Sequence, residues 1–378
     1  MHPIVIVGSG LAGYTLLKEI RKRDATTPVT LVTADDGAFY SKPNLSNAFA
    51  TGRTAAALAS ASAEKMAADQ NATVLTHTRV AAIDTQGQRI RTVTGELEYS
   101  KLVLALGADP FPHGLSGSGA GDVLAVNDLA DYAAFRSAID GKRRIAVLGG
   151  GLIGCEFAND LVHAGYTVDV VHLGEWPLER LLPVEAGQRL AGSLAALGVS
   201  WHFGRTGKSV ERMSDGYRVT LDNGETVAAD VVLSAIGLKP RTRLAQAAGI
   251  AVGRGIQTNR LLEASVANVY AMGDCAEVDG LNLPYVQPLM VQARALAATL
   301  AGTPTPVVYP AMPVMVKTPA HPVAVLPPRI GAAGSWKVEC SDTGVCALHL
   351  DEAGRLQGFA LTGSETGRRN ALAKDIVA

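Results

Sequence analysis

The chain contains 378 residues, of which 48% are hydrophobic and 18% are charged, and its formal net charge is -1. This length predicts two or three domains, and the composition is typical of a soluble protein with a large core. A charge this close to zero provides no general attraction to nucleic acid or anionic lipid, so neither is expected as a partner. The N-terminus has no basic segment before its first glycine, and no apolar run approaches the roughly 18 residues that cross a bilayer. We therefore expect neither a signal peptide nor a membrane span.

The first elements along the chain follow the order strand, glycine turn, helix, strand. The apolar run 4–7 leads into Gly8, Gly10 and Gly13, apolar residues then recur at helical spacing, and residues 29–33 form a second apolar run. This order predicts a βαβ unit.

The same order returns in the middle of the chain. An apolar run at 145–148 is followed by glycines at 149–151 and 154, a helical pattern and a second run at 168–171. Two such units indicate an internal duplication at the scale of domains.

Shorter features accompany these units. The segments 102–110 and 231–240 each place an apolar strand before a glycine turn. The sequence YRVTLDNGETV predicts a hairpin that turns at 222–224. The glycine- and serine-rich loop 116–121 is expected to cross between domains.

The C-terminal part has a different composition and pattern. From about Thr303 prolines become frequent, and short strand-like runs replace the glycine-turn helices. Together the patterns predict an α/β fold with two Rossmann-like dinucleotide-binding domains of the three-layer ββα type and a small C-terminal α+β domain. The expected boundaries are 1–112 with 244–310 for a discontinuous first domain, 113–243 for the second, and 311–378 for the third.

The two glycine turns have the chemistry of dinucleotide sites. In GxGxxG the first glycine makes a tight turn, the second lets the backbone approach a pyrophosphate, and the third lets helix and strand pack closely. The exposed N–H groups and the positive helix end then hold the phosphate charge. Packing turns alone are the alternative, but two copies between strand and helix favour two dinucleotide sites.

The residues at the end of each second strand bear on which nucleotide is bound. An acidic ribose ligand usually stands there. The first unit offers Thr33, Ala34 and Asp35, and the second offers His172 with Glu175 three residues later. No arginine immediately follows the second strand, which favours NADH over NADPH. His172 is either a ribose contact or a surface loop histidine.

The cysteines indicate the cellular setting. Cys155, Cys275, Cys340 and Cys346 form no CxxC pair, which fits a reducing cytoplasm and argues against a structural zinc or iron–sulfur site. We therefore expect a cytoplasmic enzyme without a metal site. Cys155 and Cys275 are expected to be core residues.

A further segment identifies a family. TNRLLEASVANVYAMGD, residues 258–274, resembles the second FAD fingerprint of the two-dinucleotide-binding-domain, FAD- and NAD(P)-dependent pyridine nucleotide oxidoreductases. The glycine turns of 102–110 and 231–240 resemble the linking motif of that family, and the resemblance covers nearly the whole chain in order. It implies FAD in the first domain, with Asp274 on the ribityl chain, and a nicotinamide nucleotide in the second.

The resemblance also implies catalytic residues. NADH would deliver a hydride to flavin N5, and a glutamate at position 156 would lie close to flavin and nicotinamide. Without the resemblance, Glu156 is a first-turn glutamate favoured by the helix dipole. Lys42 is its candidate partner, and Lys317 would approach the flavin unless it is a solvated lysine at a strand end. Lys42, Glu156 and Lys317 are thus the expected catalytic residues.

The expected cofactor-binding residues come from the glycine turns, the strand ends and the fingerprint segments. They are Gly8, Ser9, Gly10, Leu11, Ala12, Gly13, Thr33, Ala34, Asp35, Lys42, Val80, Ala105, Gly107, Gly149, Gly151, Gly154, Glu156, Gly237, Gly273, Asp274, Gln287 and Lys317.

The electron acceptor is inferred from missing thiols and from further resemblance. Disulfide reductases of this fold carry CxxxxC after the second strand, but residues 36–60 contain no cysteine, so electrons would leave the flavin directly. YSKPNLS, at 40–46, resembles an element of reductases that serve small iron–sulfur proteins. The segments 239–259, 273–290 and 313–323 resemble rubredoxin–NAD reductases, and flavorubredoxin reductases share them.

This resemblance implies an FAD-dependent reductase that transfers a hydride from NADH to FAD and then single electrons to rubredoxin. Rubredoxin would in turn support an oxygenase or an oxygen-detoxifying system. The alternatives are a flavorubredoxin reductase or an NADH-dependent 2Fe–2S ferredoxin reductase; an NADH oxidase, a peroxidase and a redox sensor are more distant. The protein would be a monomer or a homodimer. Because rubredoxins are acidic, a basic docking rim is expected, with candidates Lys42, Lys239, Arg241, Arg243, Arg294 and Lys317.

Overall fold

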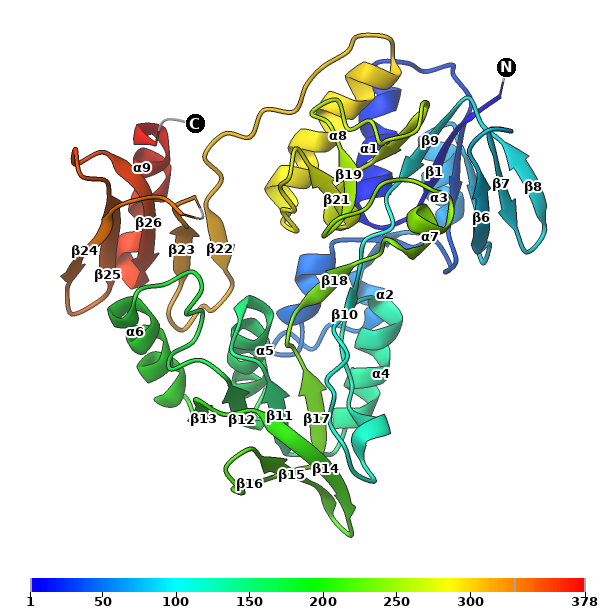
Figure 1. Cartoon of the computed structure of the whole chain (residues 1–378). Helices are drawn as coiled ribbons and strands as arrows, with labels where there is room; N and C mark the ends of the chain where they lie inside the picture. The colour runs from blue at the N-terminus through cyan, green and yellow to red at the C-terminus, as the bar shows by residue number, and fades with distance from the viewer. Residues whose placement is uncertain (1, 330, 377–378) are drawn as a thin grey trace. The chain divides into compact units, whose positions relative to one another are not determined.

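The computed structural model describes residues 2–329 and 331–376, and its chain separates into two compact units (Figure 1). Unit 1 contains the residues up to 42 together with 57–109 and 238–309, and unit 2 contains 43–56, 110–237 and the residues from 310 onward. The short segment 43–56 therefore belongs to unit 2. The three-domain boundaries given above stay a prediction.

A parallel sheet forms the centre of unit 1. Its strand order is β20-β9-β1-β2-β5, and Ile4 pairs with Val29 on one side and Lys101 on the other. All four residues of β1 are buried, as expected for a parallel strand that is covered on both faces. The strands are β1 (Ile4–Val7), β2 (Val29–Val32), β5 (Thr73–Leu75), β9 (Lys101–Leu104) and β20 (Val269–Ala271).

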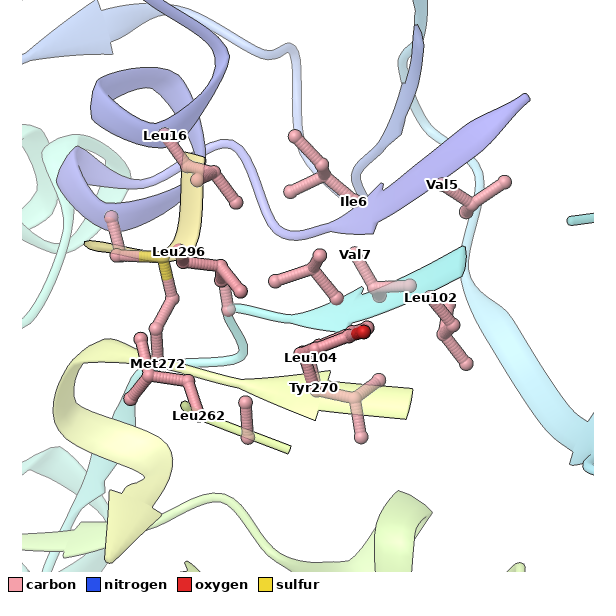
Figure 2. Close-up of a cluster of buried hydrophobic side chains, with 14 of the residues drawn as sticks. Val5, Ile6, Val7, Leu16, Leu102, Leu104, Leu262, Tyr270, Met272 and Leu296 are labelled. Atoms are coloured by element: carbon pink, nitrogen blue, oxygen red, sulfur yellow. The ribbon is translucent and has the colours of Figure 1, made fainter. Parts of the chain in front are cut away.

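Helices and an antiparallel sheet cover the two faces of this parallel sheet (Figure 1). Helix α1 (Leu11–Arg21) packs on α8 (Val286–Leu300), and the antiparallel layer consists of β6 (Val80–Asp84), β7 (Arg89–Thr92) and β8 (Gly95–Glu98). Figure 2 shows side chains from the parallel strands, α1 and α8 meeting in one buried cluster. Unit 1 thus has the predicted three layers.

The remaining shorter elements lie in unit 1 or at the points where the chain passes between the two units. They are β3 (Phe39–Tyr40), α2 (Ala55–Leu58), β4 (Ala59–Ala61), α3 (Ala63–Asp69), β10 (Ala108–Pro110), β18 (Leu238–Pro240), α7 (Arg243–Ala247), β19 (Ile256–Thr258) and β21 (Ala276–Val278).

Unit 2 contains the second parallel sheet, with strand order β13-β12-β11-β17. An antiparallel meander, β14-β15-β16, shares buried side chains with this sheet, and the predicted hairpin at 222–224 joins β15 to β16. Loop 116–121 does not cross between units, because Ser116 pairs with Ser209 and Gly119 donates to the Val210 carbonyl inside unit 2. The elements are α4 (Leu129–Ile139), β11 (Arg144–Leu148), α5 (Leu152–His163), β12 (Thr167–His172), α6 (Val184–Ala195), β13 (Val199–Phe203), β14 (Gly207–Met213), β15 (Gly216–Leu221), β16 (Thr226–Ala229) and β17 (Val231–Ser234).

The C-terminal residues form an antiparallel sheet within unit 2, as the strand-like runs predicted. Its strand order is β22-β23-β26-β25-β24, and helix α6 packs against β25 and β26. The elements are β22 (Val314–Val316), β23 (Val323–Leu326), β24 (Ser335–Cys340), β25 (Val345–Leu350), β26 (Leu356–Thr362) and α9 (Arg369–Asp375). Across the described residues of both units, no helix has the length and apolar character needed to cross a membrane.

Candidate functional site

The first glycine turn joins β1 to α1 and needs glycine for steric reasons. Gly8 has φ of +117°, and a Cβ there would collide with the Ala105 carbonyl. A Cβ at Gly13 would collide with the Gly8 carbonyl, whereas a Cβ at Gly10 would meet no atom of the described chain within 4 Å. The turn is therefore closely packed at its first and third glycines and open at its second, which is the arrangement that lets a pyrophosphate approach.

The predicted ribose ligands of unit 1 come together at the end of β2. The hydroxyls of Ser9 and Thr33 lie 2.8 Å apart, and they donate to Asp35 Oδ1 at 3.0 Å and 2.5 Å. The Gly37 N–H donates to the same oxygen at 3.0 Å. Asp35 is exposed, so this network orients a solvent-facing carboxylate beside the turn. It fits a carboxylate that accepts from ribose hydroxyls.

The second fingerprint lies against the first in unit 1. Gly273 has φ of +75°, its N–H donates to Gln292 Oε1 at 2.7 Å, and a Cβ at this glycine would lie 2.9 Å from the Cβ of Ala12. The turn that carries Asp274 is thus next to the first turn of α1. The two segments predicted to hold FAD therefore converge in the fold.

Other predicted residues of unit 1 come from several elements. Gly107 has φ of +72° and its carbonyl accepts from the Arg241 N–H at 3.0 Å, while Val80 begins β6 and Gln287 is exposed in the first turn of α8. Contacts with a cofactor stay predictions for these residues, as they do for Leu11, Ala34 and Lys42.

The glycine turn of unit 2 repeats the geometry of the first. Gly149 has φ of +106°, and a Cβ there would lie 2.6 Å from the Ala235 carbonyl oxygen. A Cβ at Gly154 would collide with the Gly149 carbonyl, and one at Gly151 would meet no described atom within 4 Å. Gly237 has φ of +112°, and a Cβ there would be in contact with the ring of Phe111. The two turns are therefore alike in detail: the first and third glycines are closely packed and the second is open.

His172 is the half-buried last residue of β12, beside this turn, and not a surface loop histidine. Its Nδ1 accepts from the Gly150 N–H at 3.1 Å, and its Nε2 lies 3.1 Å from the Trp176 carbonyl oxygen. Burial lowers the pKa of this imidazole below its ordinary value of 6.5. Because both ring nitrogens are engaged by the backbone, the structure gives no support to a ribose contact from this side chain.

Glu156 is fully buried on α5 and is held by a set of groups within unit 2. Its Oε2 accepts from Ser46 Oγ at 2.5 Å and pairs with Lys317 Nζ at 2.9 Å, and its Oε1 accepts from the Lys317 N–H at 2.9 Å. Lys317 Nζ also donates to Ser46 Oγ at 3.1 Å and to the Pro43 carbonyl. Glu156 is therefore not a solvated first-turn glutamate, and Lys317 is paired with it. The predicted pairing with Lys42 stays a prediction.

The same helix holds two other segments of unit 2 through buried polar side chains. Asp160 accepts from the Phe49 N–H at 2.7 Å and the Ala50 N–H at 3.2 Å, and Asn159 accepts from the Ala320 N–H at 3.2 Å. Burial raises the pKa of Asp160 despite these donors. Sequence reasoning missed Ser46 and Asp160. The available signal for Asp160 was a second carboxylate one helical turn after Glu156, beside Asn159 on the same helix face.

The two cysteines next to the predicted nucleotide motifs are core residues. Cys155 and Cys275 are fully buried, as expected; burial raises the thiol pKa of both, that of Cys275 to about 11. The described residues contain no group of three histidine, cysteine or acidic side chains placed to hold a metal ion. Of the predicted basic rim, Arg241 pairs with Asp109 at 2.6 Å and Lys317 pairs with Glu156. The rim stays a prediction.

Comparison with known families gives the affiliation of the chain. Residues 2–298 match the family profile described as pyridine nucleotide-disulphide oxidoreductase. The chain belongs to this family. Residues 306–376 match a second profile, described as a rubredoxin binding C-terminal domain. The predicted fold class is therefore confirmed, and the fingerprint and glycine turns described above belong to a family that binds FAD and NAD(P)H.

Full-length relatives and solved structures agree with this family. The chain is 50% identical to a "Rubredoxin-NAD(+) reductase" of Alcanivorax borkumensis, over all of this chain and 99% of that protein. It is 42% identical to a "Nitric oxide reductase FlRd-NAD(+) reductase" of Aeromonas salmonicida, over 96% and 93%. A ferredoxin reductase from Rhodopseudomonas palustris superposes with a TM-score of 0.90 at 25% identity, covering 100% and 96%. An NADH:rubredoxin oxidoreductase from Clostridium acetobutylicum gives 0.80 at 20% identity, covering 99% and 94%, and supports the fold alone.

Proposed function

We propose that this chain is an FAD-dependent reductase that takes a hydride from NADH and passes electrons singly to rubredoxin. The observation that carries the proposal is the order of matches along one chain. A pyridine nucleotide oxidoreductase segment at 2–298 is followed directly by a segment at 306–376 of the kind that binds rubredoxin. The 50% identity to a rubredoxin–NAD(+) reductase extends through both segments.

The residues of unit 1 fit FAD. Gly10 leaves room for a pyrophosphate at the N-terminus of α1, Asp35 is oriented to accept from ribose hydroxyls, and Asp274 would accept from the ribityl chain. When bound, FAD supplies the ability to accept two electrons together and to release them one at a time. The protein would supply position and a fixed electrostatic environment.

In unit 2 the glycine turn at 149–154 would hold the pyrophosphate of the nicotinamide nucleotide. NADH over NADPH is supported because no arginine immediately follows β12, and because burial lowers the pKa of His172 and so disfavours a charged ring there. The paired Glu156 and Lys317 would present a nearly neutral, rigid group to the reaction. A cytoplasmic location is part of the proposal.

Steady-state assays test this function. The purified protein, loaded with FAD under anaerobic conditions, should reduce rubredoxin with NADH much faster than with NADPH, and much faster than it reduces a 2Fe–2S ferredoxin. Equal or faster reduction of ferredoxin would contradict rubredoxin as the acceptor, but the protein would still be a reductase. A failure of NADH to bleach the flavin would contradict the function as a whole.

A second candidate acceptor is flavorubredoxin. Its support is the series of relatives named as FlRd-NAD(+) reductases, which includes the 42% identical protein of Aeromonas salmonicida and one of Klebsiella pneumoniae at 36%. The identity to the rubredoxin–NAD(+) reductases is higher, at 45% and 50%, and this order favours free rubredoxin. Including a flavorubredoxin in the same assay compares the two acceptors directly.

A further inference from the structure

A histidine ends β12 at the place where an acidic ribose ligand usually stands. The ring of His172 is engaged from both sides by the backbone of its own unit, through the Gly150 N–H and the Trp176 carbonyl. Because Nδ1 accepts a hydrogen bond, the proton of the neutral ring is on Nε2, which donates to the Trp176 carbonyl. The side chain thus ties the glycine turn to the loop that follows β12.

The ring also explains a glycine that the nucleotide motif does not require. Gly150 occupies a variable position of GxGxxG, yet a Cβ there would lie 2.8 to 3.2 Å from three atoms of the His172 side chain. On its other side the ring meets Phe203 edge-on, with centroids 6.3 Å apart. The imidazole therefore fills the space above Gly150 and fixes the path of the turn.

Unit 1 ties the corresponding positions together with different chemistry. There the variable position is Ser9 and the residue that follows β2 is Thr33; their hydroxyls lie 2.8 Å apart and both donate to Asp35 Oδ1. In both units, side-chain hydrogen bonds thus connect the glycine turn to the end of the second strand. In unit 2, however, the connecting group is the imidazole of His172, and its Nδ1 accepts a hydrogen bond only when that nitrogen is unprotonated.

We propose that His172 is a positioning residue for the pyridine nucleotide, and that only its neutral form holds the turn at Gly150 in the shape that binds the pyrophosphate. A protonated imidazole has no lone pair at Nδ1 and would direct a second N–H at the Gly150 N–H. Nucleotide affinity should therefore weaken in acid. The inference rests on the proposed assignment of the nicotinamide nucleotide to unit 2.

The surroundings of the ring set the pH at which this happens. Burial is the main influence and lowers the pKa of His172; Glu179 and the hydrogen bond with the Trp176 backbone oppose it, and Arg180 lowers the pKa further. Arg205 donates its backbone N–H to the His172 carbonyl at 3.0 Å, and Glu175 is an exposed carboxylate in the loop after β12. Because the folded pKa is below 6.5, affinity should be constant near neutral pH and should fall as pH drops through that lowered pKa.

The test is the affinity of the oxidised, FAD-loaded protein for NAD+, measured by calorimetry between about pH 5 and 8. His172→Asn replaces Nδ1 by an amide oxygen that accepts but does not titrate, so this variant should bind at neutral pH within a few-fold of the wild type and lose the acid weakening. His172→Leu removes the acceptor and should weaken binding by about tenfold at neutral pH. His202→Asn, one strand away on β13, is the matched control and should keep the wild-type pH profile.

A second pair of variants tests the packing. Gly150→Ala should weaken NAD+ binding because its methyl group would meet the ring, and adding His172→Ala should recover part of the loss. Retained FAD content shows that unit 1 is intact. A His172→Asn profile identical to the wild type, or full affinity in Gly150→Ala, would overturn the inference alone. No NAD+ binding by the wild-type protein would overturn the proposed function as well.

Discussion

At the scale of single residues, the main feature is a buried ion pair with defined partners. Glu156 has 1% of its side chain exposed and Lys317 has 29%, and Ser46 hydrogen-bonds to both side chains. A buried charge is tolerated only when it is paired and hydrogen-bonded, and removing one partner leaves the other uncompensated. The sequence predicted that Glu156 and Lys317 matter, but not that they meet, because they are far apart in the chain and no local pattern encodes the contact.

Replacing Lys317 by methionine should therefore destabilise the protein. We expect Lys317→Met to lower the free energy of unfolding by about 3 kcal/mol, measured by urea denaturation. Adding Glu156→Gln should recover part of the loss, because the unpaired charge is then removed. The control is Lys337→Met, whose partner Glu339 is exposed, with an expected change below about 0.5 kcal/mol. Equal effects of the two lysine substitutions would contradict the account.

Asp160 should give a pH-dependent contribution to stability. Its pKa in the folded protein is raised above the ordinary 3.8 by burial, so the folded state binds this proton more tightly than the unfolded state. The contribution of Asp160 to stability is therefore lost as pH rises from about 3.8 through the raised pKa. As pH rises through that range, the wild type should lose unfolding free energy relative to the Asp160→Asn variant, which has no carboxyl to titrate. Urea titrations at several pH values measure it, and a difference independent of pH would refute the assignment.

At the scale of elements, local patterns predicted most of the fold and long-range contacts supplied the rest. The glycine spacing gave both βαβ units, and the strand-like C-terminal runs correspond to β22–β26. The strand order of that sheet, with β26 between β23 and β25, has no local signal. The same holds for α5, whose buried polar side chains hold segments 43–50 and 317–320 through contacts between distant parts of the sequence.

The glycine turn of unit 2 provides an element-scale prediction with a matched control. Gly154→Ala places a methyl group against the Gly149 carbonyl and should lower the free energy of unfolding by about 1–3 kcal/mol. Gly192→Ala, inside α6, meets no described atom within 4 Å and should raise stability by roughly 0.5–1 kcal/mol. Urea denaturation of both variants gives the comparison. Loss of stability in Gly192→Ala but not in Gly154→Ala would contradict the steric argument.

At the scale of the whole molecule, the positions of the cysteines bear on how electrons would leave the flavin. The absence of cysteine from 36–60 and the burial of Cys155 and Cys275 both favour direct transfer from flavin to an external carrier. The sequence predicted this route and the family. It did not predict that segment 43–56 belongs to unit 2, because its hydrogen bonds to α5 join residues about 110 positions apart and have no local signal.

Docking of an acidic carrier should depend on ionic strength. We expect the second-order rate with rubredoxin to fall on the order of tenfold from low to high salt, because attraction between opposite charges is screened. Stopped-flow absorbance across a salt series measures this rate. The rate with oxygen, which is neutral, is the control and should stay nearly constant. A rate with rubredoxin that is equally flat would contradict electrostatic docking.

The most direct test of the central claim is single-turnover stopped-flow mixing of the NADH-reduced protein with rubredoxin, a 2Fe–2S ferredoxin or oxygen. The account predicts fast reoxidation by rubredoxin alone, with two rubredoxins reduced for each NADH consumed, because a hydride carries two electrons and rubredoxin accepts one. Slow reoxidation by rubredoxin together with fast reoxidation by either other acceptor would contradict it.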